Sequence, residues 1–331
     1  MVLRGGAAVV EPGYALATRV RNGLFDRGWK RVVRAGRPVI SIGNITAGGT
    51  GKTPMVAHLC RLLLEMGHRP AVLMRGYGQD EHRELAEALG GRVAIEVNAD
   101  RAAGARRVLN RDHSVDVFVL DDGFQHRRLH RDLDLVLVDA MQPSGYNRLL
   151  PRGLLREPVS GLRRADAVIV TRAEAVSDVH LQELDARLRS LTGSPAAAHA
   201  AYGWACLWHG DERRSVDELA GRRVAGACGV GNPAAFERSL AQAVGPGGQV
   251  VSFDALGDHY AYSPPAVRRI LDAARDAGAE LLVTTGKDWV KWRQLLAARP
   301  PLPVWRAEVA VRFVRGGEAI EAMLKRCAGD G

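Results

Sequence analysis

Residues 39–53 read Val-Ile-Ser-Ile-Gly-Asn-Ile-Thr-Ala-Gly-Gly-Thr-Gly-Lys-Thr, and this stretch decides the fold. An apolar run at 39–42 is typical of a buried strand, a glycine-rich turn follows it, and a helical pattern begins at Thr53 with Pro54 in its first turn. Strand, glycine loop, Gly-Lys-Thr and helix together form the pattern of a phosphate-binding loop. In such a loop, backbone N–H groups and the positive helix end hold phosphates, the lysine reaches the outer ones, and the hydroxyl holds magnesium. The stretch therefore predicts a nucleoside triphosphate site.

The loop departs from the pattern at one position, where Thr46 replaces a glycine. Its other glycines still supply the backbone freedom that such a loop needs. The alternative is an ordinary glycine-rich turn, and Gly-Lys-Thr between a strand and a helix argues against it. We expect the nucleotide to contact Thr46, Ala47, Gly48, Gly49, Thr50, Gly51, Lys52 and Thr53.

The composition is that of a globular protein, with 331 residues of which 47% are hydrophobic and 25% charged. This length is sufficient for two domains with their own cores. Four widely spaced cysteines without a C-x-x-C pair argue against a metal or disulfide framework and favour a reducing compartment. We expect neither a membrane-spanning helix nor a signal peptide, because no apolar stretch has the required length or flanks.

Further buried strands are predicted at 71–74, 116–120, 133–139 and 167–171, with helices between them. This alternation implies right-handed crossovers and an α/β fold of the P-loop NTPase type, with a doubly wound, mostly parallel sheet. From about residue 199 a ribbon at 198–209 and strands near 223–227, 249–253 and 281–285 predict a second, smaller α/β domain. We therefore expect a basic N-terminal segment at 1–34, a P-loop core at 35–198 and a smaller domain at 199–331.

Acidic residues follow two of the predicted strands. Asp121 and Asp122 come directly after the third strand, where P-loop enzymes place the carboxylate that holds magnesium. Asp80 and Glu81 stand at the start of a predicted helix, where acids also suit the helix dipole, so capping alone would explain them. Because ligands gather at the carboxyl ends of parallel strands, Asp80, Asp121 and Asp122 are expected near the phosphate loop.

The N-terminal segment at 14–34 is basic and amphipathic. Leu16, Val20 and Leu24 form an apolar stripe beside Phe25 and Trp29. The basic residues around the stripe are Arg19, Arg21, Arg27, Lys30, Arg31 and Arg34. Such a helix can lie in the interface of an anionic membrane. The segment alone slightly favours the alternative, a helix that packs on the core with a solvated basic face.

Motifs along nearly the whole chain resemble those of the tetraacyldisaccharide 4'-kinases, which phosphorylate a lipid A precursor on the cytoplasmic face of the inner membrane in Gram-negative bacteria. They recur in the family's order at 42–54, 75–78, 121–126, 150–158, 229–233, 258–259 and 285–288. The resemblance implies ATP and Mg²⁺ as cofactors and an acylated disaccharide phosphate as substrate. It also changes the interpretation of the N-terminal segment, which becomes an anchor on an anionic membrane surface.

The resemblance implies a role for each site residue. Lys52 acts on the phosphates of ATP, and the family's catalytic pair corresponds to Asp80 and His259, which would deprotonate the 4'-hydroxyl once the two domains close. The implied magnesium ligands are Thr53, Glu81, Asp121 and Asp122, with either aspartate as the direct one. The implied substrate contacts are Gln125, His126, Arg156 and Glu157. The chain departs from the family in a shorter insert after 75–78, with 79–81 as its counterpart, and in Gly286, where the family usually has glutamate.

Three other function classes fit less well. A GTPase would need an Asn/Thr-Lys-x-Asp signature, and in Thr-Gly-Lys-Asp at 285–288 the lysine and aspartate are adjacent. A soluble small-molecule kinase or ligase fits the core but leaves the basic N-terminal segment unexplained. The net charge of +9 suits any anionic partner, yet aromatics are few and no recognition module appears, so we expect no nucleic acid. No obligate protein partner is evident either.

Overall fold

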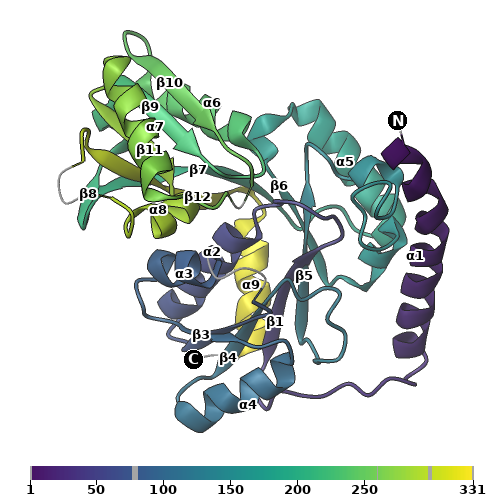
Figure 1. Ribbon diagram of the computed structural model, residues 1–331. Coiled ribbons are helices and arrows are strands. Elements are labelled where there is room, and N and C mark those ends of the chain that lie inside the picture. The colour runs from purple at the N-terminus through teal and green to yellow at the C-terminus, as the bar shows by residue number, and fades with distance from the viewer. Residues whose placement is uncertain (1, 77–80, 259, 297–299, 330–331) are drawn as a thin grey trace. The chain divides into compact units, whose positions relative to one another are not determined.

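The structure is a computed structural model that describes residues 2–76, 81–258, 260–296 and 300–329. The chain divides into two compact units (Figure 1). The first unit takes the described residues of 1–77, 89–202 and 311–331, and the second takes those of 78–88 and 203–310. Two long strands, β7 (Ala198–His209) and β12 (Val304–Arg315), run from one unit into the other.

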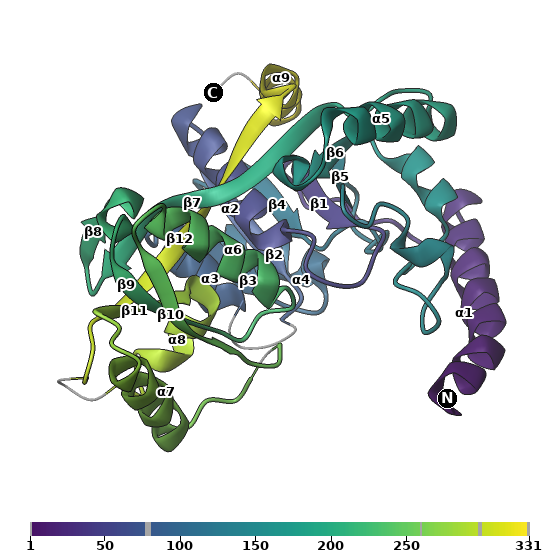
Figure 2. The same ribbon diagram turned by 90° about the horizontal axis from the view of Figure 1, so that it is seen from above.

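The first unit is built on a parallel sheet in which neighbouring strands follow the order β3-β2-β4-β1-β5-β6-β7 (Figure 1 and Figure 2). The strands before β7 are β1 (Val39–Asn44), β2 (Pro70–Met74), β3 (Ala94–Val97), β4 (Val117–Asp121), β5 (Leu133–Asp139) and β6 (Ala167–Thr171). Its α-helices are α1 (Val2–Asp26), α2 (Lys52–Glu65), α4 (Arg101–Arg111), α5 (Asp178–Thr192) and α9 (Gly317–Ala328), and its short 3₁₀ helices are η1 (Gly145–Asn147), η2 (Val159–Arg164) and η3 (Ala173–Ala175).

Helices cover both faces of this sheet. The chain moves from β1 through α2 in one direction across the sheet, and from β3 through α4 and from β6 through α5 in the other. Right-handed crossovers in opposite directions place helices on opposite faces. Every residue of β1, β2, β4, β5 and β6 is buried, which explains why these strands are continuous apolar runs rather than alternating patterns. The predicted doubly wound parallel sheet is confirmed.

The second unit has a smaller parallel arrangement, in which β9 pairs with β10 and β11, and β11 pairs with β12. Its elements are α3 (Glu81–Ala88), β8 (Glu212–Arg214), η4 (Val216–Leu219), β9 (Arg223–Cys228), α6 (Pro233–Val244), β10 (Gln249–Ala255), α7 (Pro264–Asp276), β11 (Leu281–Thr285) and α8 (Gly286–Trp292). The range 198–209, predicted as a ribbon, is one long strand, β7, and only its end pairs antiparallel with the short strand β8.

The two units differ from the predicted contiguous domains in two places. Helix α9 belongs to the first unit, where it packs against β5. Helix α3 belongs to the second unit, because it packs on α8 and its Glu87 carboxylate forms ion pairs with Arg293 at 2.6 Å and Arg306 at 3.3 Å. Sequence patterns missed both assignments, since side chains far apart in the chain make these contacts.

Helix α1 ends at Asp26, eight residues before the end of the predicted segment, and Gly28 then takes a left-handed conformation with φ of +70°. The side chains that face the rest of the first unit are mostly polar, among them Glu11, Tyr14 and the buried Thr18. Of the predicted apolar stripe, Leu16 and Val20 are 63% and 53% exposed, whereas Leu24 and the neighbouring Phe25 are half-buried. Helix α1 thus contacts the rest of the first unit largely through polar side chains and leaves part of its apolar stripe exposed. Among the helices of the described residues, none is both long and apolar enough to cross a membrane.

Candidate active site

The phosphate loop lies between β1 and α2, as predicted. Gly48 and Gly51 take positive φ angles of +108° and +79°, which other residues rarely adopt. Lys52 opens α2, and its Nζ lies 3.5 Å from Asn44 Oδ1, while Asn44 Nδ2 donates to Thr50 Oγ1 at 2.8 Å. Asn44 therefore connects the end of the strand to the far end of the loop. The first amides of α2, which have no acceptor within the helix, remain to hold phosphates.

The first part of the loop has a different environment. The Ala47 N–H donates to Leu154 O at 2.6 Å, and the Arg156 N–H donates to Ile45 O at 2.7 Å. Thr46 forms an isolated bridge with Leu155 and is buried. These bonds commit the Ala47 amide to the protein, so of the predicted loop contacts the later residues are better placed to bind phosphate through their backbone.

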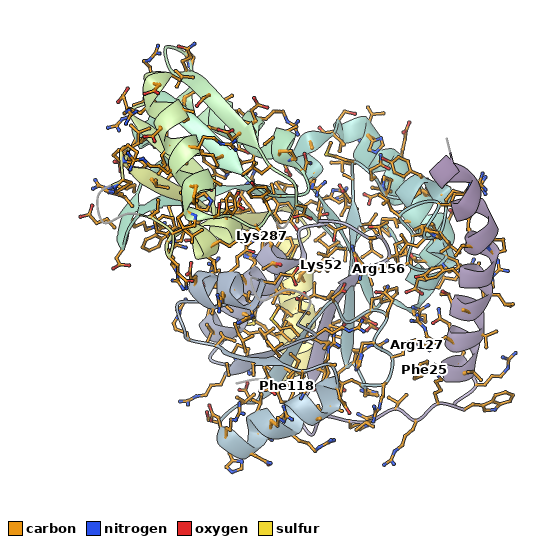
Figure 3. The ribbon with its side chains drawn as sticks, in the orientation of Figure 1. Phe25, Lys52, Phe118, Arg127, Arg156 and Lys287 are labelled. Atoms are coloured by element: carbon orange, nitrogen blue, oxygen red, sulfur yellow. The ribbon has the colours of Figure 1, made fainter. Side chains whose placement is uncertain are left out.

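The acids of β4 lie beside the loop, because β4 pairs with β1 and Asp121 is in register with Ile42. Asp122 accepts from Arg156 Nη1 at 2.8 and 2.7 Å and lies 3.7 Å from Lys52 Nζ. Lys52 and Arg156 are labelled in Figure 3. Burial opposes ionisation of Asp122, but the charges of Lys52 and Arg156 outweigh it and hold the pKa of this carboxyl below its ordinary value. The carboxylate is therefore ionised at neutral pH, as a metal ligand must be.

Arg101 is a site residue that the sequence reasoning missed. It is buried at the start of α4, and its charge helps to lower the pKa of both Asp122 and His126. The pKa of the His126 ring is lowered to about 4, mainly by burial and also by the charge of Arg101. The ring is therefore neutral at pH 7. Its Nε2 atom is buried and has no hydrogen-bond partner among the described residues. A hydroxyl or amide of a ligand could bind there.

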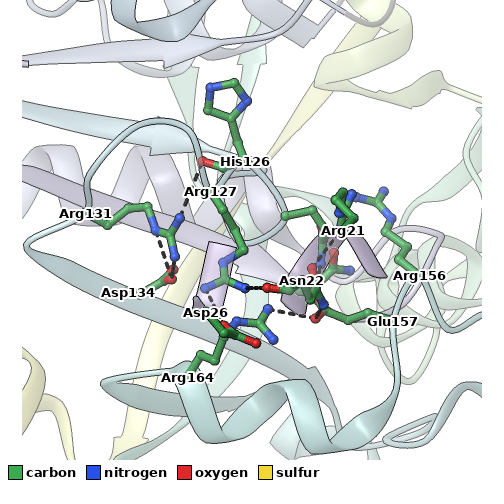
Figure 4. A network of polar contacts seen from close by, with 12 residues as sticks. Arg21, Asn22, Asp26, His126, Arg127, Arg131, Asp134, Arg156, Glu157 and Arg164 are labelled. Carbon is green, nitrogen blue, oxygen red and sulfur yellow. Dashed lines mark hydrogen bonds and ion pairs between the residues drawn. The ribbon is translucent and has the colours of Figure 1, made fainter. Parts of the chain in front are cut away.

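Gln125 and Glu157 form an internal network. Gln125 Nε2 donates to Asn44 O at 2.8 Å and to Glu157 Oε1 at 2.9 Å. The Glu157 side chain is fully buried, and its Oε2 also accepts from Arg164 at 2.7 Å and from Asn22 of α1 at 3.3 Å (Figure 4). Both residues are predicted substrate contacts. Their hydrogen bonds support positioning roles instead: Gln125 holds the end of β1, and Glu157 holds α1.

Arg127 fixes the end of α1 to the same region. Its guanidinium donates to Asn22 O at 3.0 Å, pairs with Asp26 at 2.7 Å and lies over the Phe25 ring at 5.2 Å (Figure 3 and Figure 4). A cation at a helix C-terminus also interacts favourably with the helix dipole. Arg127, which lies in a run of basic residues after Gln125, thus serves to hold α1.

Replacing Glu157 with alanine should lower the free energy of unfolding by about 3 kcal/mol, because it leaves the Arg164 charge without its buried partner. The measurement is a urea denaturation curve. The matched control is Glu183→Ala on the exposed face of α5, where we expect a change below about 0.5 kcal/mol. Equal curves for the two variants would contradict the positioning role of Glu157.

The predicted catalytic pair, Asp80 and His259, lies outside the described residues. Glu81, the predicted metal ligand next to Asp80, opens α3 in the second unit. That unit also contains both neighbours of position 259. Lys287 Nζ lies 2.7 Å from Asp258 Oδ1, and Lys291 Nζ donates to Tyr260 O at 3.2 Å, so α8 holds the chain on both sides of this position. The expectation that the pair forms only when the two domains close stays a prediction, because both residues lie outside the described ones.

The residues present fit a magnesium nucleotide. In the described part of the chain, no three His, Cys, Asp or Glu side chains gather as a metal site. Magnesium needs no such cage, since it is usually bound by one or two carboxylates together with phosphates and water. Asp121, Asp122 and the Thr53 hydroxyl supply this kind of donor set beside the loop. Fold and site together define a protein of the P-loop nucleotide-binding class.

Comparison with known proteins narrows this class to one family. The sequence model of tetraacyldisaccharide-1-P 4'-kinase (LpxK) matches residues 8–328. The tetraacyldisaccharide 4'-kinase of Geobacter metallireducens is 42% identical over 88% of this chain and 89% of its own, and that of Geobacter sulfurreducens is 37% identical over 93% and 89%. LpxK from Aquifex aeolicus, solved in complex with ATP, superimposes with a TM-score of 0.77 at 30% identity and covers 99% of this chain and 100% of its own. The chain belongs to the tetraacyldisaccharide 4'-kinase family.

Proposed function

We propose that the chain transfers the γ-phosphate of ATP to the 4'-hydroxyl of a tetraacyldisaccharide 1-phosphate, a precursor of lipid A. The observation that carries this proposal is the family match over residues 8–328. The phosphate loop supports it, because Lys52 and the acids at the end of β4 gather where a nucleotide would bind. The reaction class is therefore phosphoryl transfer to an alcohol.

The loop and its acids have separate tasks in this reaction. Lys52 and the amides at the start of α2 hold the β- and γ-phosphates and balance their charge. The Thr53 hydroxyl, one of Asp121 and Asp122, and Glu81 are the proposed magnesium ligands. Bound Mg²⁺·ATP supplies the phosphoryl group, and most of the catalysis is positioning and charge neutralisation.

The proton of the acceptor hydroxyl needs a base. We assign this role to Asp80, with His259 as its partner. A carboxylate with an ordinary pKa is a weak base for an alcohol, and a histidine partner helps it to hold or pass on the proton. The bonds from Lys287 and Lys291 to residues 258 and 260 support this assignment, because they anchor the chain on either side of His259.

A groove of about 480 Å³ beside α1 is the proposed place for part of the acceptor. It is lined by Arg19, Asn22, Gly23, Asp26, Glu157, Pro158, Ser160, Gly161 and Arg164. Arg19 suits a phosphate group, while Arg164 is already paired with Glu157. Asn22, Ser160 and the carboxylates of Asp26 and Glu157 suit the hydroxyl groups of a sugar. The same helix exposes Leu16 and Val20, so a disaccharide in the groove could leave its acyl chains on the apolar side.

We also place α1 on the surface of an anionic membrane, at the cytoplasmic face of the inner membrane. Its outward face combines Leu16 and Val20 with Arg19, and Trp29, which is 73% exposed, follows the helix. Exposed apolar side chains flanked by basic residues are typical of a helix that lies in a membrane interface. The polar contacts of Tyr14 and Asn22 hold the opposite face to the protein.

Reversing the charge of Arg19, Arg27 and Lys30 to glutamate should release the protein from anionic vesicles. Each basic residue near such a surface contributes about 1 kcal/mol to binding. Flotation with phosphatidylglycerol-containing liposomes measures the bound fraction. The control reverses three exposed charges elsewhere in the first unit, at Arg189, Lys325 and Arg326, and should bind like the wild type. Unchanged flotation of the first variant would contradict the anchor.

Transfer of label from γ-labelled ATP to a tetraacyldisaccharide 1-phosphate tests the function directly. We expect a labelled bisphosphate that forms only with magnesium. The other candidate, a soluble small-molecule kinase, predicts equal activity on a disaccharide phosphate without acyl chains. Absence of label in the acylated acceptor would refute the proposed function.

A further inference from the structure

Three successive carbonyl groups of the phosphate loop are held by side chains from another part of the first unit. The Arg172 guanidinium donates to Gly49 O, Thr171 Oγ1 donates to Thr50 O at 3.3 Å, and Tyr202 Oη donates to Gly51 O at 3.0 Å. Thr171 is the last residue of β6, Arg172 follows it, and Tyr202 lies in β7. We call Thr171, Arg172 and Tyr202 the carbonyl anchors.

These bonds determine where the loop's amides point. In a trans peptide the C=O and the next residue's N–H point in opposite directions, because the group is planar. Fixing the carbonyls of residues 49–51 on the side of β6 and β7 therefore turns the N–H groups of residues 50–52 to the other side. The Thr50 N–H closes a local turn to Gly48 O at 3.1 Å. The amides of Gly51 and Lys52 remain, and they stand at the start of α2, where phosphate binds.

The anchors are themselves fixed. Arg172 has a left-handed backbone with φ of +57°, and its guanidinium pairs with Asp139 at 2.8 Å. The Tyr202 N–H donates to Glu174 Oε2 at 3.1 Å. Burial raises the pKa of the Tyr202 hydroxyl, so it stays protonated and keeps its donor. The loop thus rests on side chains that are themselves held by other residues of the first unit.

The position of the Tyr202 ring gives a second reason, besides the positive φ angle, for a glycine at position 51. A Cβ on Gly51 would lie 2.4 Å from Cζ and Oη of Tyr202. Gly51 is needed both for its positive φ and for the close approach of this ring. The contact brings a β7 side chain directly against the first residue before α2.

We propose that Thr171, Arg172 and Tyr202 are positioning residues for nucleotide binding, which hold the phosphate loop in its binding conformation before ATP arrives. This inference rests on the proposed function for the identity of the nucleotide. A loop that is already ordered loses less conformational entropy when ATP binds, and the dissociation constant is therefore lower. None of the three side chains needs to touch ATP, since each acts through a loop carbonyl.

The test is the dissociation constant of Mg·ATP, measured without acceptor by titration with a fluorescent ATP analogue and competition. Tyr202→Phe removes one hydrogen bond and keeps the ring, so the dissociation constant should rise about 2- to 10-fold. Thr171→Val should have a similar effect. Arg172→Met should have a larger one, and Arg172→Lys, which keeps a donor, should recover part of the loss.

The matched control is Tyr262→Phe, which removes a tyrosine hydroxyl bonded to Asp288 at 3.0 Å in the second unit. It should leave the dissociation constant unchanged. Unchanged affinity in Tyr202→Phe and Arg172→Met would overturn the inference, as would a loss of melting temperature in these variants without any loss of affinity. Because ATP binding is measured without the disaccharide, failure of label transfer to the acceptor would refute the proposed function separately.

Discussion

Replacing Lys52 with alanine should lower the turnover of phosphoryl transfer by roughly 10²- to 10³-fold, the usual cost of losing one electrostatic contact to a developing charge. Its ammonium group is the loop's cation, and it lies 3.7 Å from Asp122 at the edge where the phosphates would sit. Thr53→Ala should have an effect of the same size, because it removes a proposed magnesium ligand. Initial rates at saturating ATP and acceptor measure both effects.

Two further variants make this prediction specific. Thr53→Ser keeps the hydroxyl and should retain most of the turnover. Lys325→Ala removes an exposed lysine of α9 and should behave as the wild type. Circular dichroism should show all four proteins folded. Near-normal turnover of Lys52→Ala would place the ATP site elsewhere.

Asp80→Ala and His259→Ala should each lower turnover by roughly 10²- to 10⁴-fold, the range expected for a general base. The double variant should be little worse than the poorer single one, since groups that act as a unit are not additive. ATP affinity should stay the same in all three variants, because neither residue is assigned to the nucleotide. Single-turnover transfer of the labelled phosphate measures the losses.

The control for this pair is His113→Ala, which removes an exposed histidine of the first unit. Losses that multiply in the double variant would show that Asp80 and His259 act independently. A fully active Asp80→Ala enzyme would assign the base role to Asp121 or Asp122. In that case Asp80 would serve only as a cap of α3, the alternative given by the sequence analysis.

Contacts within the second unit hold the described residues that neighbour Asp80 and His259 in the chain. Glu87 ties α3 to Arg293 and Arg306, and α8 ties residues 258 and 260 to the same unit. The described chain that follows Asp80, and the described residues on both sides of His259, are therefore anchored within the second unit. We accordingly expect mutations in α8 to affect the proton transfer rather than ATP binding.

Features that depend on local order along the chain could be predicted from the residues alone. A strand, a glycine turn and Gly-Lys-Thr occupy neighbouring positions, and glycine permits the positive φ angles found at Gly48 and Gly51. Continuous apolar runs predicted strands buried on both faces, and β1, β2, β4, β5 and β6 all have this burial. The placement of Asp121 and Asp122 beside the loop also followed, because acids at the ends of neighbouring parallel strands meet at one edge.

Which side chains support these features depends on how the chain folds, because the partners are distant in sequence. Tyr202 reaches Gly51 across 151 positions, and Gln125 meets Glu157 across 32. Periodicity shows that α1 has two faces, but the polar contacts of Tyr14 and Asn22 decide which face meets the protein. Burial of Glu157 and the unpartnered Nε2 of His126 likewise depend on packing, which residue order alone does not specify.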